Sequence, residues 1–109
     1  MIVRKLTIKR RKSIVASLMK VKIYIVDEND CQRVIWGYPC KEVGRLKNNS
    51  ELVVEINNNQ HRIFADVTLQ VADVYADMII IPAGEEDVII SGKNVYSPFK
   101  GNPFIFDKL

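Results

Sequence analysis

The chain has 109 residues, of which 48% are hydrophobic and 27% are charged, and its formal net charge is +3. These values are typical of a single folded domain, here spanning residues 1–109, and they exclude a disordered chain. The opening segment has no uncharged run longer than Ser13 to Met19, and no signal-peptide cleavage site follows it. We therefore expect a cytoplasmic protein without a membrane span.

Positive charge is concentrated near the N-terminus. Residues 1–26 hold eight Lys or Arg and no acidic residue, whereas residues 27–109 hold eight basic and thirteen acidic residues. Such asymmetry indicates either an anionic partner for the first segment or basic strands that pair beside acidic ones within one fold. The second interpretation is the more common one.

Alternation of apolar and polar residues, the mark of a strand with one buried face, recurs along the chain. It predicts a strand over LTIKR, with Leu6 and Ile8 on one face, and a long strand from Ile14 to Val26. Further strands are expected at residues 51–56, 61–66, 78–82 and 88–90, and in PFIFD with Phe104 and Phe106 on one face. Residues 66–77 fit a strand and a helix equally well. Seven or eight short strands predict an antiparallel all-β sandwich, with a small β-barrel as the alternative.

The stretch CQRVIWGYPC places two cysteines around a turn. Gly37-Tyr38 suits a two-residue hairpin turn with glycine first, in which Cys40 faces Ile35 and Cys31 faces Gly44. The two sulfurs then lie about four residues apart along the ladder, roughly 13 Å, which is too far for a disulfide. We expect two free, mostly buried thiols, and with a single histidine in the chain we predict no zinc site.

No catalytic residue, metal site or cofactor is predicted. His61 is the single histidine, and no nucleophile signature surrounds the cysteines or any serine. Asp27, Glu28 and Asp30 gather carboxylates in one turn, which suits either a hard cation or an ordinary acidic turn, and the EF-hand pattern is absent.

Two glycines invite a comparison with a phosphate loop. Gly84 and the Gly92-Lys93 pair are too far apart in the sequence for that motif, and Asn94 replaces its Ser or Thr. We predict a hairpin turn at Gly92-Lys93.

The pieces LTIKR, KVKIYI, PAGEEDVIISGKN and GNPFIFD, in this order, resemble a group of small uncharacterised bacterial all-β proteins over nearly the whole chain. Residues 19–56 also resemble the PEGA type of small β-sandwich module, although residues 43–46, VGRL, stand in place of its usual Pro-Glu-Gly-Ala element. The resemblance implies a sandwich architecture and no particular activity.

Two functional hypotheses follow from the distribution of aromatic and basic residues. Trp36 and Tyr38 on a hairpin tip suggest a non-catalytic module that binds another protein or a copy of itself, because large aromatic residues often anchor interfaces. The competing interpretation makes Trp36 a core residue. The alternative function is binding of nucleic acid or another polyanion. Its candidate residues are Arg4, Lys9, Arg10, Arg11, Lys12, Lys20 and Lys22. The competing interpretation is a solvated corner between strands, whose charges discourage the edge strand from pairing with another chain.

Overall fold

The computed structural model describes residues 2–67, 76–97 and 102–108, and these residues form nine strands and no helix. The strands are β1 Val3–Arg10, β2 Val21–Val26, β3 Arg33–Ile35, β4 Tyr38–Leu46, β5 Glu51–Asn57, β6 His61–Val67, β7 Asp77–Ile81, β8 Val88–Asn94 and β9 Phe104–Phe106. Among the described residues, no helix is long and apolar enough to cross a membrane.

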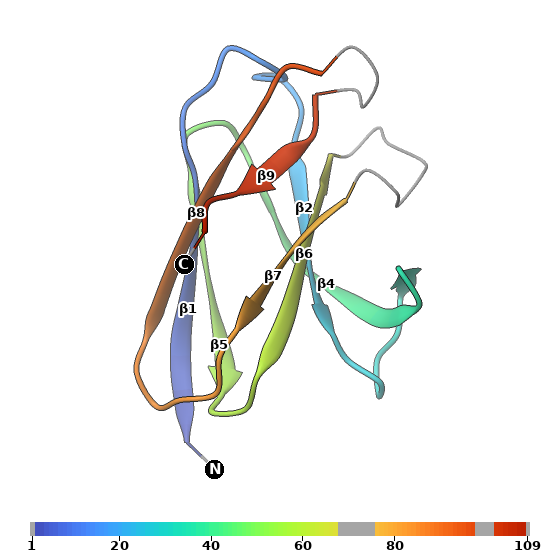
Figure 1. Cartoon of the computed structure of the whole chain (residues 1–109), viewed down its shortest axis with the longest axis vertical. Coiled ribbons are helices and arrows are strands. Elements are labelled where there is room, and N and C mark those ends of the chain that lie inside the picture. The colour runs from blue at the N-terminus through green and yellow to red at the C-terminus, as the bar shows by residue number, and fades with distance from the viewer. Residues whose placement is uncertain (1, 68–75, 98–101, 109) are drawn as a thin grey trace.

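The strands form two sheets packed face to face (Figure 1). One sheet has the order β5-β1-β8-β9, and the other has the order β3-β4-β2-β6-β7. The predicted all-β sandwich is therefore confirmed. Its pairing is not purely antiparallel, because β1 and β8 run parallel from Leu6↔Val88 to Arg10↔Gly92. Both strands start at the same end of the sandwich and run in the same direction (Figure 1).

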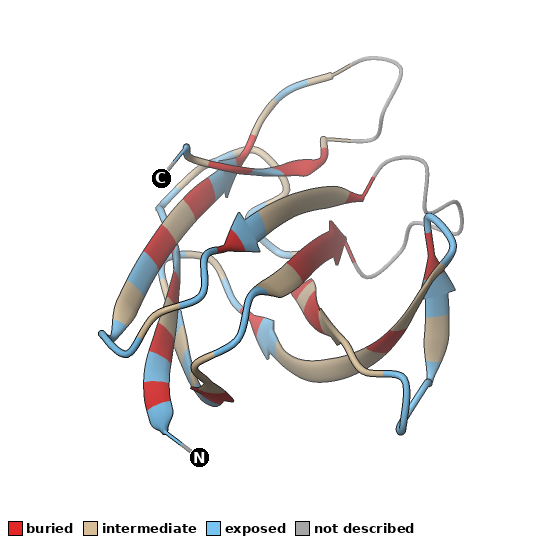
Figure 2. Cartoon of the chain, turned by 60° about the horizontal axis from the view of Figure 1, so that its bottom comes forward, coloured by how far each residue is buried: buried red, intermediate tan, exposed pale blue. Residues whose placement is uncertain are grey.

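The main core lies between the two sheets and follows the period-two pattern of the strands. In β1, Leu6 and Ile8 are fully buried while Lys5 and Lys9 on the opposite face are exposed. Figure 2 shows this alternation as bands along the strands. The core also includes Val21, Ile23, Leu46, Ile56, Ile63, Ala65, Ile81, Ile90, Phe104 and Phe106. Phe104 and Phe106 share one face of β9, as predicted, with ring centroids 5.3 Å apart.

A second apolar cluster forms on the other face of the five-stranded sheet. β4 carries a β-bulge, because Tyr24 pairs with Glu42 while its neighbour Ile23 pairs with Gly44. A bulge bends its strand and increases the local twist. Figure 2 shows β4 curling strongly, which carries the β3–β4 hairpin round toward the outer face of the sheet. The enclosed cluster comprises Tyr24, Ile35, Cys40, Phe64 and Ala76, with Val26, Tyr38 and Met78 at its margin.

Three expectations about the elements are corrected or left outside the structure. The long strand from Ile14 to Val26 is wrong, because β2 begins only at Val21. Residues 11–20 connect β1 in one sheet to β2 in the other and form no strand (Figure 1). The hairpin turn at Gly92-Lys93 is also wrong, since both residues lie within β8. Of the ambiguous segment 66–77, residues 68–75 lie outside the described residues.

Candidate functional site

The β3–β4 hairpin turns at Trp36 and Gly37, one residue earlier than predicted. Ile35 pairs with Tyr38, and Val34 pairs with Pro39. The predicted Gly37-Tyr38 turn would have made Pro39 close the hairpin, which requires an N–H that proline lacks. In the observed register Tyr38 takes that position, and φ is positive at both turn residues, 52° and 83°, as in a type I′ turn.

Trp36 occupies a backbone conformation that is unfavourable for a large side chain. A left-handed φ costs a residue with a Cβ about 1–2 kcal/mol. The indole packs edge-on against Phe64, with ring centroids 5.3 Å apart and planes at 86°. Even so, 45% of Trp36 remains exposed, so it is both a lid on the second cluster and a surface residue.

Two further side chains complete the apolar surface of the hairpin. Tyr38 lies 6.0 Å from the Phe64 ring between centroids, and the Arg62 guanidinium carbon stands 4.8 Å from the centre of the Tyr38 ring. Val34 is 57% exposed. The hairpin therefore presents Val34 and Trp36 to solvent and is held in place through Tyr38 and Phe64.

An ion pair between half-buried Arg33 and buried Asp66 lies on the same face of the sheet as the second cluster, and pattern reasoning did not identify it. Arg33 Nη1 stands 2.9 Å from Asp66 Oδ2 and donates to Tyr24 Oη at 3.3 Å. Asp66 is only 1% exposed, and among the described residues neither of its carboxylate oxygens accepts a hydrogen bond of good geometry. Burial raises the pKa of Asp66, and the nearby Arg33 only partly opposes this rise. The sequence did contain one signal for this site, because Asp66 is the single acidic residue within the strand HRIFADV.

Replacing Asp66 with asparagine should change how stability depends on pH. Because the folded-state pKa of Asp66 is raised, its protonation favours the folded state. This stabilisation is fully present below the pKa that Asp66 has in the unfolded chain. It is lost as pH rises through the higher pKa that Asp66 has in the folded chain. The free energy of unfolding of the natural chain should therefore fall relative to that of Asp66→Asn as pH rises from acid toward neutral.

Denaturant titrations of both chains over this pH range measure the difference. Asp107→Asn is the matched control of opposite sign, because hydrogen bonds from Ser91 and Arg11 lower the pKa of Asp107. A constant difference between Asp66→Asn and the natural chain at all pH values would contradict the assignment.

The two cysteines are unbonded, as expected, but only one of them is buried. Cys40 lies within the second cluster, and burial raises the pKa of its thiol. Cys31 is exposed because it precedes β3 in the β2–β3 connection, so the expectation of two mostly buried thiols is wrong for this residue. In the observed register Cys40 pairs with Arg33, and Cys31 lies two positions before Arg33. The two cysteines are therefore offset by two residues along the hairpin, where the predicted register gave four.

His61 lies at a side hollow of ≈ 260 Å³ whose lining includes Asp27, Lys41 and Glu55. Its Nε2 is 2.9 Å from Asn57 Oδ1, and burial lowers the imidazole pKa. A hydroxyl or thiol nucleophile must lie within hydrogen-bond reach of the base that activates it. No Ser, Thr or Cys is among the described residues that line this hollow.

Two of the three carboxylates in the acidic turn make local contacts. Asp27 Oδ1 accepts a hydrogen bond from the Asn29 backbone N–H at 2.9 Å, and Asp30 pairs with Lys41 at 3.1 Å. Glu28 is exposed in the same turn. Within residues 2–67, 76–97 and 102–108, no group of three or more His, Cys, Asp or Glu side chains is placed to hold a metal ion.

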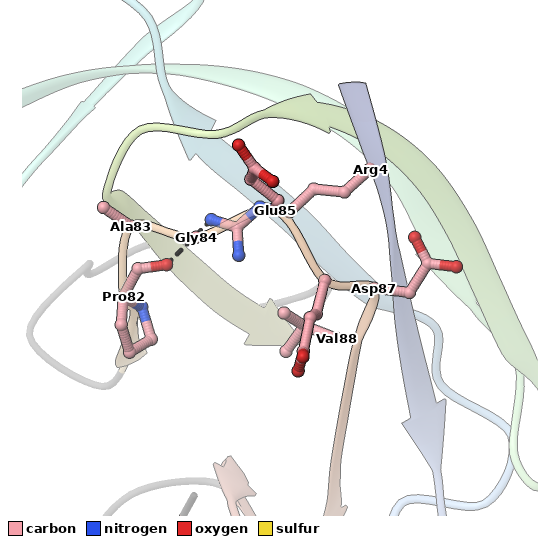
Figure 3. A pocket seen from close by; sticks show the side chains of 8 residues that line it. Arg4, Pro82, Ala83, Gly84, Glu85, Asp87 and Val88 are labelled. Atoms are coloured by element: carbon pink, nitrogen blue, oxygen red, sulfur yellow. Dashed lines mark hydrogen bonds between the residues drawn. The ribbon is translucent and has the colours of Figure 1, made fainter. Parts of the chain in front are cut away.

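Arg4 closes one end of the sandwich from the inside. Its Nη2 donates to the carbonyls of Asn59 and Pro82 at 3.0 and 2.7 Å, and its Nε donates to that of Asn57 at 3.2 Å. Figure 3 shows the guanidinium beneath the connection from Pro82 to Asp87, where the surface has a hollow of ≈ 470 Å³. Arg4 thereby joins two connections that cross between the sheets.

Arg10 closes the opposite end in the same way. Its Nη1 donates to the carbonyls of Met19 and Leu46 at 2.6 and 2.8 Å, and its Nη2 donates to that of Ala16 at 2.9 Å. Its Nε donates to Asn94 Oδ1 at 3.0 Å. The side chain is 2% exposed, and burial lowers its pKa.

The structure therefore divides the predicted polyanion-binding residues. Arg4 and Arg10 are buried at opposite ends of β1, and Arg11 pairs with Asp107 at 2.6 Å. The remaining members are Lys9, Lys12 and Lys20, which are exposed, and Lys22, which is half-buried. A signal for the buried pair was present in the sequence, because Arg4 and Arg10 share the parity of Leu6 and Ile8 and therefore point inward.

Comparison with known proteins adds no family. No protein-family model matches the chain, and no curated protein matches it in sequence. The resemblance over residues 19–56 to the PEGA type stays a prediction.

Proposed function

We propose that the protein is a non-catalytic module that binds another protein, or a second copy of itself, through the β3–β4 hairpin. The observation that carries this proposal is Trp36, which keeps 45% of its surface exposed at a turn position with φ of 52°. Asparagine or glycine would suit that position better. A tryptophan that occupies this position at a conformational cost supports a role for the ring beyond forming the turn.

The surroundings of Trp36 suit a contact surface. Val34 adds a second exposed apolar side chain, and β3 is the last strand of its sheet. Tryptophan and tyrosine are enriched among residues that dominate binding energy, and their rigid rings supply contact area at a low cost in conformational entropy. Phe64 holds both Trp36 and Tyr38. The exposed thiol of Cys31 supports a reducing, cytoplasmic setting for the module.

Trp36→Asn is the variant that best separates binding from folding. It creates the Asn-Gly pair that type I′ turns prefer, so the hairpin register is kept while the ring is removed. Loss of the edge-on contact with Phe64 should cost about 1–2 kcal/mol of stability, partly offset by relief of the backbone conformation. Binding or self-association should fall at least tenfold, the effect expected for an interface anchor.

Photo-crosslinking in cells identifies the partner and its contact surface. A photoreactive amino acid replaces Val34, and the matched control replaces Ile89, an exposed apolar residue on the other sheet. We expect a discrete crosslinked species from position 34, a copy of the chain or one other protein, that disappears with Trp36→Asn. Sedimentation velocity of the purified chain distinguishes the two partners. Equal crosslinking from positions 34 and 89, or none from 34, would contradict the proposal.

A further inference from the structure

The β1–β2 connection carries two aliphatic side chains that are almost wholly in water. Ile14 is 92% exposed and Leu18 is 99% exposed, more than any other large hydrophobic residue among the described ones. Figure 1 shows this connection at the end of the sandwich opposite the β7–β8 connection. Full burial of one such side chain is worth about 1.5–3 kcal/mol, so the pair favours transfer into an apolar medium.

The backbone around these two residues is anchored. Arg10 binds the carbonyls of Ala16 and Met19 from below. The Ser13 backbone N–H donates to Asn48 Oδ1 at 3.0 Å, and the Met19 N–H donates to the Ala16 carbonyl at 3.0 Å. Because these contacts hold the backbone against the end of the sandwich, Ile14 and Leu18 form a fixed apolar tip.

Lysines surround the apolar tip. Lys12 and Lys20 lie in the same connection, and Lys47 follows β4. Lys20 and Lys47 line one hollow of ≈ 290 Å³ together with Leu18 and Met19. Within the described part of the chain, none of these three lysines has an acidic partner within ion-pair distance. Among the described residues, this end of the sandwich therefore combines positive charge outside any ion pair with exposed aliphatic surface.

The opposite end of the molecule is acidic. Asp27, Glu28 and Asp30 lie in the β2–β3 connection, and residues 85–87, EED, lie in the β7–β8 connection. Both connections are at the lower end of the molecule in Figure 1, away from the β1–β2 connection. A molecule charged in this way turns its basic end toward an anionic surface and its acidic end away from it.

We propose that this basic, apolar end docks peripherally on a membrane containing anionic phospholipid. Ile14 and Leu18 insert at the boundary between headgroups and acyl chains, Lys12 contacts lipid phosphates, and the hollow between Lys20 and Lys47 receives one headgroup phosphate. The aliphatic tip favours this partner over nucleic acid, because single-stranded bases stack on aromatic rings and phosphates bind cations alone. Apolar area together with attraction to anionic lipids is what sets the strength of interfacial binding.

Vesicle sedimentation tests the docking. The full chain should bind vesicles of phosphatidylcholine and phosphatidylserine at least tenfold more tightly than vesicles of phosphatidylcholine alone. Each lysine near the surface contributes about 1 kcal/mol, so Lys20→Gln/Lys47→Gln should weaken binding about 30-fold. Ile14→Ser/Leu18→Ser should weaken it at least tenfold at unchanged charge. The matched control, Ile89→Ser/Lys5→Gln, changes an exposed apolar and a basic residue on a sheet face and should have little effect.

A fluorescence experiment reports insertion directly. Trp36 is the single tryptophan of the chain, so Leu18→Trp in a Trp36→Phe background places the only indole at the tip. Its emission should shift to the blue on anionic vesicles, and lipids brominated in the acyl chain should quench it. Trp36→Phe alone should bind vesicles as the natural chain does, which separates membrane docking from the hairpin interface.

Three outcomes would overturn the proposal. These are equal binding to neutral and anionic vesicles, binding unaffected by Ile14→Ser/Leu18→Ser, and absence of binding at low salt. Gel-shift measurements with single-stranded and duplex DNA test whether this end of the molecule binds nucleic acid instead. DNA binding that depends on the lysines and not on Ile14 or Leu18, without vesicle binding, would assign this end to nucleic acid.

Discussion

Replacing Arg10 with methionine should lower the free energy of unfolding by about 3–5 kcal/mol. Arg10 donates four hydrogen bonds, to the carbonyls of Ala16, Met19 and Leu46 and to Asn94 Oδ1. Methionine fills similar space but donates none, so buried acceptors lose their partners at about 1–3 kcal/mol each, less where water enters. This is a large share of the roughly 5–15 kcal/mol by which a domain is stable.

Denaturant titration measures the effect, and two variants serve as references. Arg11→Met removes an arginine whose ion pair with Asp107 is half-exposed, so it should cost less than about 1 kcal/mol. Arg10→Lys should fall between the two, because one ammonium group cannot reproduce the planar fork of donors. A cost for Arg10→Met as small as that for Arg11→Met would show that the carbonyl contacts are not stabilising.

Gly92→Ala should be the second severe change, at about 2–4 kcal/mol. A Cβ at this position of β8 would collide with the backbone oxygen of Ile105 and would stand 2.6 Å from Phe104 Cζ. Both obstacles belong to β9, which pairs with β8 through Gly92↔Phe106. To relieve these collisions β9 would have to move away from β8, and this movement would disturb the packing of Phe104 and Phe106 in the core.

Gly44→Ala is the matched control for this prediction. Its Cβ would stand 2.7 Å from Leu52 Cδ2, which is the far end of a flexible side chain. Rotation of Leu52 relieves that contact, so the cost should stay at about 1 kcal/mol. Hydrogen exchange locates the damage: in Gly92→Ala the backbone N–H of Asp107, which donates to the Ser91 carbonyl, should lose protection. Equal costs for the two glycine variants would contradict the steric argument.

The proposed hairpin interface and the proposed membrane-docking end occupy different parts of the molecule. The hairpin projects from the side of the five-stranded sheet, whereas the β1–β2 connection lies at one end of the sandwich (Figure 1). Contact at one surface therefore leaves the other accessible. Together the two proposals describe an adaptor that holds a protein partner near an anionic membrane, and each has its own variants.

Local sequence pattern predicted most of the strands because it depends only on neighbouring residues. Alternation at Leu6 and Ile8 identified β1 and its buried face, and Phe104 and Phe106 identified β9. The same alternation was misleading between Ile14 and Val21, where apolar residues face water. Periodicity reports which residues share a face, but it does not report whether a neighbouring strand is there to pair with that segment.

The candidate sites depended more strongly on long-range contacts. Trp36 and Tyr38 were proposed from the sequence because large aromatic residues beside a Gly-Tyr-Pro turn are conspicuous, although the turn itself was misplaced by one residue. The ion pair of Arg33 and Asp66 was not found, because its members are 33 positions apart in the chain. Arg33 lies on β3 and Asp66 on β6, with β4 and β2 between them in the sheet, so the two side chains meet only because the hairpin curls over the outer face of the sheet.

By itself, then, the sequence determined the all-β class and the inward face of most strands, because side chains alternate across any strand whatever its partners. Only the tertiary structure decided that β1 pairs in parallel with β8, that the hairpin curls over Phe64, and that Arg4 and Arg10 hold the two ends. These features depend on which distant segments become neighbours, because a buried carbonyl or ring needs a partner in space that local pattern does not specify.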